Sequence, residues 1–204
     1  FDRTPNTIFD YTFKNNELLY VKGGDLYLLK LPNTNTVTIA NGVDVNQFAL
    51  SQNIQDVFYL TNEDEKNNLY KYSITTSEKK LIGNLDKAAE AILGSNNAEN
   101  EIFFVQAQKL YVLRNGQPEL LYTDKKITND SDLRADYILS ADASRVLITK
   151  STHQGIVAEI GIFEVTGKKY TILHQKLSGL DNLLDISYFS GFTDDSKNIY
   201  GYFL

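Results

Sequence analysis

One short pattern recurs along the 204-residue chain, and this repeat constrains the fold more than any other feature of the sequence. Residues 140–150 read SADASRVLITK and residues 193–203 read TDDSKNIYGYF, so a small hydroxyl residue and an aspartate precede an apolar run in both. Looser copies start at residues 12, 51 and 96. The residue six places after each start is apolar, and these five anchor residues are separated by 39, 45, 44 and 53 residues. The anchor residues are Leu18, Val57, Ile102, Val146 and Ile199.

The spacing of the copies predicts an all-β chain. About 40 to 50 residues is the length of four short strands with their turns, which make one blade of a β-propeller. An apolar run precedes each anchor, and two more runs follow each of the first four anchors, with Asn, Asp, Gly or Ser between them. We predict one propeller domain with four complete four-stranded blades and a partial fifth. The predicted blades cover residues 9–41, 47–84, 89–124, 136–175 and 187–204.

The fifth copy stops after its second strand, and this leaves two interpretations open. Residues 1–8 could add one outer strand to the fifth blade and close a five-bladed ring. Alternatively, the chain is an arc of a six- to eight-bladed ring from a longer protein. We favour the arc, because residues 1–8 supply one strand where two are needed, and Pro5 fits only an edge position.

The aspartates of the repeat predict a tight turn between the first and second strands of a blade. An Asx or Ser side chain can accept a hydrogen bond from the backbone N–H two residues further on, which closes such a turn. Asp142 and Asp195 occupy this position, and Asn53 is in the matching place of the second copy. We therefore interpret the two aspartates as turn-forming residues and not as ligands.

The segments SADASRV and TDDSKNI resemble the propeller repeat with the consensus Ser-Pro-Asp-Gly-Lys-x-Ile, although each lacks the Pro and the Gly. The repeat is similar to the one in TolB and in the propeller domains of prolyl oligopeptidases and dipeptidyl peptidases. The resemblance covers almost the whole chain and implies a propeller fold. Its motif is short and specifies the fold far better than the function.

Charge and composition exclude several classes of function. The net charge of -6 and the pI near 5.0 argue against a nucleic-acid partner, which requires clustered Lys and Arg. The chain has no Cys, so disulfides and thiolate chemistry are excluded. No apolar run approaches the roughly 20 residues of a transmembrane segment. We expect an extracytoplasmic bacterial protein, either periplasmic, displayed on the cell surface or secreted.

The sequence offers no catalytic constellation, and we predict no cofactor and no enzymatic activity. Nucleophile-elbow, Walker, dinucleotide-binding and His-Glu-x-x-His motifs are all missing. The chain has two histidines, His153 and His174, and these could meet Asp181 and Asp185 in a metal or acid-base site on one face of the fourth blade. We favour the alternative, in which both are surface histidines on long loops.

Three further features have a structural and a functional interpretation. The acidic loop TNEDEKNN, residues 61–68, predicts a solvated hairpin tip. The long connections 125–134 and 174–185 are candidate binding loops, and the second carries leucines at helical spacing. Leu-Tyr pairs recur at equivalent blade positions, which favours packing between blades over a binding surface. These pairs are Leu26-Tyr27, Leu69-Tyr70 and Leu110-Tyr111.

Together these features predict a non-catalytic propeller that acts as a binding or scaffolding module for a protein or peptide partner. The alternative is a regulatory propeller domain of a peptidase-like enzyme whose catalytic domain is absent from this chain. A glycan or small-molecule hydrolase ranks last, because it needs carboxylates on the innermost strands. Those strands supply only Asp10, Glu90 and Asp136, at their outer ends.

Overall fold

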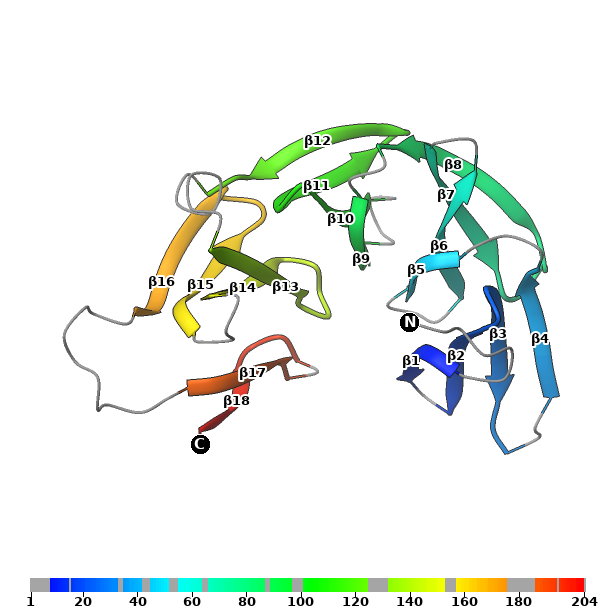
Figure 1. Ribbon diagram of the computed structural model, residues 1–204, viewed down its shortest axis with the longest axis horizontal. Coiled ribbons are helices and arrows are strands. Elements are labelled where there is room, and N and C mark those ends of the chain that lie inside the picture. Colours follow the sequence, from blue (N-terminus) through cyan, green and yellow to red (C-terminus); the bar gives the residue numbers. More distant parts are fainter. Residues whose placement is uncertain are drawn as a thin grey trace. The chain divides into compact units, whose positions relative to one another are not determined.

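The computed structural model describes most of the chain as β-strands (Figure 1). The described residues are 8–14, 16–32, 35–41, 45–51, 55–63, 66–86, 89–96, 101–124, 132–152, 157–175, 186–193 and 195–203. The chain divides into two compact units, Phe1–Ile92 and Leu93–Leu204. Within the described residues no helix is long and apolar enough to cross a membrane.

The strands form five antiparallel sheets, which follow one another along the sequence. The first sheet contains β1 (Ile8–Lys14), β2 (Glu17–Lys22), β3 (Asp25–Lys30) and β4 (Asn35–Ala40). The second contains β5 (Val45–Leu50), β6 (Asp56–Glu63), β7 (Lys66–Ser73) and β8 (Lys79–Leu85). The third contains β9 (Ala89–Asn96), β10 (Glu101–Gln106), β11 (Lys109–Arg114) and β12 (Gln117–Tyr122). The fourth contains β13 (Leu133–Leu139), β14 (Arg145–Thr152), β15 (Val157–Glu164) and β16 (Lys169–Gln175). The fifth contains β17 (Ile186–Phe192) and β18 (Ile199–Phe203).

This arrangement confirms the predicted fold class, with four four-stranded sheets and a smaller fifth sheet as the blades. Each predicted strand matches an observed strand within a few residues, because the repeat fixes both the apolar runs and the turns between them. The single-domain interpretation, and a fifth blade closed by residues 1–8, stay predictions. Residues 1–7 lie outside the described part of the chain.

Burial changes across each sheet in the way that a blade requires. In β10, the second strand of the third sheet, five consecutive residues from Glu101 to Val105 are buried, whereas in β2 buried and partly exposed residues alternate. The fourth strands are mostly exposed, as β4 and β12 show. A central strand is buried on both sides only when both faces of its sheet are covered by neighbours, so its sequence is nearly continuous in apolar residues.

Packing in the first unit shows which faces meet. We call the side of a sheet that carries the anchor residue its anchor face, and the other side its opposite face. One buried cluster joins the opposite face of the first sheet to the anchor face of the second sheet. The first sheet contributes Leu19, Val21, Leu26, Leu28, Ile39 and Ala40, and the second sheet contributes Phe48, Val57, Tyr59 and Tyr72.

The repeated aspartates form the turns that the sequence predicts. The Asp142 carboxylate accepts hydrogen bonds from the Ser144 N–H at 3.0 Å and from the Ser140 hydroxyl at 2.7 Å. The Asp195 carboxylate accepts the equivalent bonds from the Lys197 N–H at 3.0 Å and the Thr193 hydroxyl at 2.6 Å. The structural role of both aspartates is confirmed. Asn53 lies outside the described residues.

The two turns also join neighbouring sheets within the second unit. The Asp142 N–H donates a hydrogen bond to the Ser196 hydroxyl at 3.0 Å, and Ser196 is 1% exposed. The guanidinium of Arg145 lies 5.5 Å from the centre of the Phe192 ring. Arg145 is on the opposite face of the fourth sheet, and Phe192 pairs with the anchor Ile199 on the fifth. The rule from the first unit, that an opposite face covers the next anchor face, therefore holds here as well.

A β-bulge occurs at the same position in the fourth strand of each complete sheet. The pairing of the third and fourth strands shifts by one residue at the same place in all four complete sheets. A bulge re-aims a side chain and disrupts an edge that could otherwise pair with another chain. The re-aimed residues Ile39 and Leu121 are buried, whereas Leu173 in the fourth sheet is 49% exposed.

Candidate functional site

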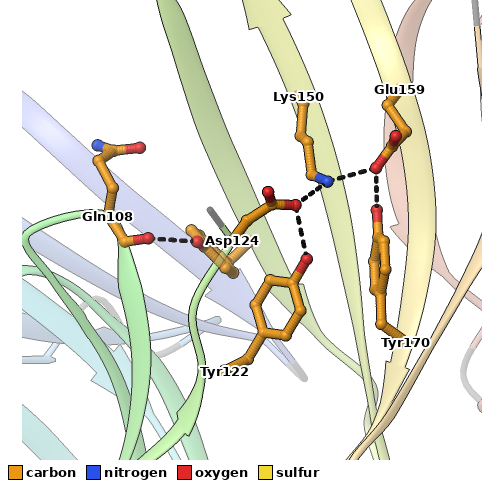
Figure 2. A network of polar contacts seen from close by, with 7 residues as sticks. Gln108, Tyr122, Asp124, Lys150, Glu159 and Tyr170 are labelled. Carbon is orange, nitrogen blue, oxygen red and sulfur yellow. Dashed lines mark hydrogen bonds and ion pairs between the residues drawn. The ribbon is translucent and has the colours of Figure 1, made fainter. Parts of the chain in front are cut away.

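The second unit contains a cluster of buried charges between the third and fourth sheets. Lys150 of β14 lies between the carboxylates of Glu159 on β15 and Asp124, which follows β12 (Figure 2). The side chains of Lys150, Asp124 and Glu159 are 3%, 11% and 5% exposed, so water solvates none of them well. A buried ammonium must be compensated by opposite charge, and here two carboxylates do so.

Strand geometry explains how Lys150 reaches this position. Side chains alternate between the two sides of a strand, so Lys150 lies on the same face as Val146 and Ile148. That face is the anchor face of the fourth sheet. Lys150 also pairs directly with Glu159 in the register of β14 and β15, which places the two side chains together on this face.

Two tyrosines complete the cluster. The Tyr122 hydroxyl donates a hydrogen bond to Asp124 at 2.8 Å, and the Tyr170 hydroxyl donates one to Glu159 at 2.9 Å. The two tyrosine rings lie 5.1 Å apart in a tilted arrangement. The Lys150 ammonium lies 4.7 Å from the centre of the Tyr170 ring, which adds a cation–π contact. Each carboxylate therefore receives both the ammonium and a tyrosine hydroxyl (Figure 2).

The environment keeps both tyrosines protonated. Burial raises the pKa of Tyr122 and of Tyr170, because the phenolate is charged and the site is shielded from water. The hydrogen bonds to Asp124 and Glu159 raise each pKa further, since a phenolate could not donate to a carboxylate. The tyrosines are thus fixed as donors and the carboxylates as acceptors.

Gly161 makes room for the Tyr170 ring. A Cβ atom at Gly161 would lie 2.4 Å from the Tyr170 ring carbon Cζ and 2.4 Å from its hydroxyl, which is far inside the contact distance. The same register position carries Tyr27, Tyr70 and Tyr111 in the first three sheets. Only a residue without a side chain lets Tyr170 cross β15 and reach Glu159.

The first three sheets fill the equivalent position with stacked aromatic pairs. The ring centres are 5.3 Å apart for Tyr20 and Tyr27, 5.4 Å for Tyr59 and Tyr70, and 5.4 Å for Phe104 and Tyr111. The recurring Leu-Tyr pairs of the sequence therefore have a packing role. Each tyrosine ring stacks on an aromatic ring of the neighbouring strand in the same sheet. Tyr70 also packs against the cluster shared by the first and second sheets.

Further polar contacts extend the same junction. The Tyr137 hydroxyl donates to the backbone carbonyl of Gln108 at 2.7 Å, and the Ala135 N–H donates to the Gln108 side-chain oxygen at 2.9 Å. At the exposed end, the Lys168 ammonium donates to the Glu119 carboxylate at 2.8 Å. Gln108 lies in the turn between β10 and β11 and Glu119 in β12, and their partners lie in the fourth sheet or, for Lys168, in the turn before β16. The anchor face of the fourth sheet is thus held to the third sheet by specific polar contacts.

The cluster has the chemistry of a structural ion-pair network. Lys150 faces two carboxylates at contact distance, and each carboxylate also accepts a tyrosine hydroxyl. Breaking one partner of such a network leaves a buried charge uncompensated, which costs several kcal/mol. The network therefore joins residues of the third and fourth sheets.

The residues proposed from the sequence as a metal or acid-base site are largely untested. His174 lies in β16 opposite Ile160. His153, Asp181 and Asp185 lie outside the described residues, so the proposed site stays a prediction. Among the described residues no group of three or more His, Cys, Asp or Glu is placed to hold a metal ion.

The structure describes some of the carboxylates on the innermost strands and part of each candidate loop. Glu90 and Asp136 are exposed, and the side chain of Asp10 is not among those described. The acidic segment 61–68 forms the predicted hairpin pairing, with Thr61 opposite Asn68, but Thr61 and Asn67 are buried and not solvated. Residues 64–65 lie outside the described part. Residues 125–131 and 176–185 of the long connections also lie outside it, and with them the predicted leucine helix.

The ionic cluster was missed by sequence reasoning, although one signal was present. A lysine at position 150 continues the alternation of Val146 and Ile148, where an apolar residue would be expected on a buried face. A charged residue in such a place indicates a buried partner. The identity of that partner depends on the contact between two sheets, and no local pattern in the sequence shows it.

Comparison with known proteins shows the fold. No protein-family model and no curated protein matches the chain. TolB from Acinetobacter baumannii is 14% identical with a TM-score of 0.60, and the match covers 90% of this chain and 46% of that one. The match to a structure from a study of two prolyl endopeptidases has 10% identity and a TM-score of 0.61, covering 85% of this chain and 30% of that one. The Swd1 β-propeller domain from Myceliophteria thermophila has 10% identity and a TM-score of 0.61, covering 96% and 64%.

These likenesses place the chain in the class of β-propeller folds, as the sheets on their own indicate. The resemblance of its repeat to the TolB and peptidase propellers is confirmed at the level of the fold. The chain spans less than two thirds of the length of each of the three structures. At these sequence identities the comparison shows the fold and does not show an activity.

Proposed function

We propose that this chain is a non-catalytic β-propeller module that binds a protein or peptide partner in an extracytoplasmic bacterial setting. The observation that carries the proposal is the buried cluster around Lys150, whose charged groups and hydroxyls are engaged with one another. A cluster whose polar groups bind one another stabilises the junction between two sheets. The rigid blades then serve to present loops, where binding residues concentrate.

The exposed apolar residues of the outer strands do not by themselves mark a binding surface. Outer strands carry partly exposed apolar side chains, and those at Leu81, Leu120 and Ile172 are 47%, 44% and 47% exposed. Leu81 and Leu120 belong to different sheets, and Ile172 is followed on its strand by Leu173, which is 49% exposed. Isolated apolar residues are ordinary on a protein surface. We therefore assign partner binding to the long connections 125–134 and 174–185.

The experiment first isolates a binding partner and then measures its affinity for the chain. The 204-residue chain is immobilised and exposed to the secreted and periplasmic proteins of the source bacterium, and any retained protein is purified and titrated by calorimetry. We expect saturable binding at a fixed stoichiometry. Replacing residues 177–184 by a Gly-Ser linker weakens binding by about 10-fold or more, whereas the control Leu81→Ser leaves it unchanged.

Two outcomes contradict the proposal. Failure to find any saturable partner removes the binding role. Turnover of fluorogenic proline-containing peptides by the purified chain, at a rate proportional to its concentration, removes the non-catalytic role.

A second candidate is a regulatory propeller of a peptidase-like enzyme. The structural likeness to a chain from the prolyl endopeptidase study, of which this chain covers 30%, supports it. A hydrolase domain in the same reading frame would favour this candidate over the first. The binding experiment separates the two, because a regulatory propeller would have its own hydrolase domain as its contact.

A further inference from the structure

The connection 125–134 between the third and fourth sheets is held at both ends by one residue of the second unit. Just before it, the Asp124 carboxylate contacts the Lys150 ammonium and accepts a hydrogen bond from the Tyr122 hydroxyl at 2.8 Å. Just after it, Ala135 lies directly opposite Lys150 in the register of β13 and β14. The two ends of the connection therefore meet at Lys150. Surface loops whose ends lie close together are frequently functional.

The turn between β10 and β11 holds the second end of the connection as well. The Gln108 side-chain oxygen accepts a hydrogen bond from the Ala135 N–H at 2.9 Å, and the Gln108 backbone carbonyl accepts one from the Tyr137 hydroxyl at 2.7 Å. Ala135 and Tyr137 are 7% and 8% exposed, so each of these donors needs an acceptor from the protein. Gln108 belongs to the same network of polar contacts as Lys150 and Asp124 (Figure 2).

Gln108 takes this position at a cost in backbone strain. Ala107 and Gln108 form the two-residue turn between β10 and β11, with φ values of 49° and 58°. The equivalent turn of the first sheet consists of Gly23 and Gly24, which adopt positive φ without strain. A residue with a side chain is strained in this region. Glycine would relieve the strain but would supply no side-chain acceptor, so the glutamine indicates a role beyond the turn.

We infer that Lys150 and Gln108 are positioning residues for partner binding, because they anchor the two ends of the connection 125–134 and restrict its freedom before the partner arrives. The inference rests on the proposed function, which assigns binding to this connection. A restricted loop loses less conformational entropy on binding, so anchoring raises the affinity. The ionic cluster then supports the binding loop in addition to the junction between sheets.

The first arm of the test measures anchoring without a partner, by brief trypsin digestion of the folded 204-residue chain. Trypsin cuts after lysine and arginine, and Lys125 and Arg134 stand directly beside the anchored residues Asp124 and Ala135. The bond after Arg134 contains the Ala135 nitrogen itself. A protease needs several residues around the cut bond to leave their native contacts, so cleavage at an anchored end is slow. Mass spectrometry of the fragments gives the rate at each position.

Each anchor is expected to protect its own end of the connection. Lys150→Met should raise the rate of cleavage after Lys125 by at least about 10-fold, because Asp124 loses its cation. Gln108→Ala should raise the rate after Arg134 by at least about 10-fold, because the Ala135 N–H loses its acceptor. The second variant leaves the buried charges intact, so it tests the inference even if the first variant does not fold.

Two controls separate anchoring from a general loss of stability. Gln108→Glu keeps a side-chain oxygen for the Ala135 N–H, and it should restore slow cleavage after Arg134. Leu147→Ala removes a fully buried side chain from the face of β14 that does not carry Lys150. It destabilises the same strand, yet both cleavage rates should stay within about 2-fold of the unchanged chain, because global unfolding stays rare. Circular dichroism checks that each variant is folded.

The second arm measures affinity for the protein that the immobilised 204-residue chain retains. Lys150→Met and Gln108→Ala should each weaken binding by about 5-fold or more, because the partner must then order a free loop. Gln108→Glu should restore the affinity, and Leu147→Ala should leave it unchanged. A residue with a structural role alone would lower stability without this pattern of loss and rescue.

Three results would overturn the inference. If Lys150→Met and Gln108→Ala are digested like Leu147→Ala, neither residue anchors the connection. If digestion is faster but the affinity is unchanged, the anchors do not serve binding. If the chain retains no protein, the proposed function fails and the binding role fails with it, whereas the digestion rates still show whether the two ends are anchored.

Discussion

The second and fourth sheets fill the same position in different ways. In the second sheet Tyr59 and Tyr70 stack across the two middle strands, and the Lys79 ammonium lies 4.0 Å from the centre of the Tyr70 ring. In the fourth sheet Ile148 and Gly161 take their places, and the Tyr170 ring enters the space that the glycine leaves. The ring brings with it a hydroxyl and, next to it, the buried Lys150 network. The difference shows that one blade geometry accepts either an aromatic stack or a satisfied ionic cluster.

The two solutions differ in what they require of the sequence. An aromatic stack tolerates a change of one ring with the loss of one contact, because its energy is mostly burial. An ionic cluster requires all its partners, because an uncompensated buried charge costs more than the pair gains. We therefore expect single changes at the fourth sheet to have larger effects than single changes at the second.

The largest effect is expected from Lys150→Met. The substitution leaves the Asp124 and Glu159 carboxylates buried beside each other without a cation, so the free energy of unfolding falls by about 3 to 5 kcal/mol. Urea denaturation followed by circular dichroism measures the change. Lys71→Met is the matched control, because Lys71 is 36% exposed in its ion pair with Asp56, and it should cost about 1 kcal/mol or less. Equal losses in the two variants would contradict the buried network.

The next effect is expected from Gly161→Ala. The new methyl group would overlap the Tyr170 ring, so the ring must move and the free energy of unfolding falls by about 1 to 3 kcal/mol. Gly167→Ala is the control, because a Cβ there would lie 3.6 Å from the nearest atom, an ordinary contact. In a Tyr170→Leu background the cost of Gly161→Ala should shrink. A cost that is the same in both backgrounds would show that Tyr170 does not occupy this space.

A smaller effect is expected at the aromatic stack of the second sheet. A double-mutant cycle with Tyr59→Leu and Tyr70→Leu should give a coupling energy of about 0.5 to 1.5 kcal/mol, the value of a stacked pair beyond its buried area. Thermal or urea unfolding of the four proteins provides the cycle. Strict additivity of the two substitutions would mean that the rings do not stack.

The smallest effect is a pH dependence at the Asp142 turn. Burial alone would raise the pKa of this carboxyl, but hydrogen bonds from Ser140, Ser144 and Ser196 lower it to about 2, against an ordinary 3.8. Because the pKa is lower in the folded chain, the carboxylate contributes stability above about pH 4, and this is lost as the pH falls toward 2. Urea midpoints between pH 2 and 5 should therefore fall less in Asp142→Asn than in the unchanged chain. Parallel curves would contradict the shift.

The sequence predicted the sheets well because the information for them is local. Anchor residues such as Val57 and Val146 mark the second strand of each blade, and Asp142 marks the turn before it, all within one repeat. Alternation of apolar residues then gives the burial pattern. The Leu-Tyr pairs were also visible, and their recurrence indicated packing between blades. Leu26 and Tyr70 do pack at the cluster shared by the first and second sheets, whereas the tyrosine rings stack within one sheet.

The cluster could not be predicted because its partners come from different repeats. Asp124 lies after the last strand of the third sheet, 26 residues before Lys150, and its role exists only where two sheets meet. Gly161 carries no signal on its own, since its meaning depends on Tyr170 crossing the neighbouring strand. Where the sequence departs from the repeat, as with a lysine or a glycine at a core position, the local pattern no longer predicts the structure. Contacts between sheets determine it there.

The most direct test of the account is a double-mutant cycle between Lys150 and Asp124, which come from neighbouring sheets. Lys150→Met, Asp124→Asn and the double variant are compared with the unchanged chain by urea denaturation. If the third and fourth sheets are joined through this pair, the coupling energy is at least about 1.5 kcal/mol. If the two substitutions add within about 0.5 kcal/mol, the sheets are not joined through this cluster, and the account of the blade junction is wrong.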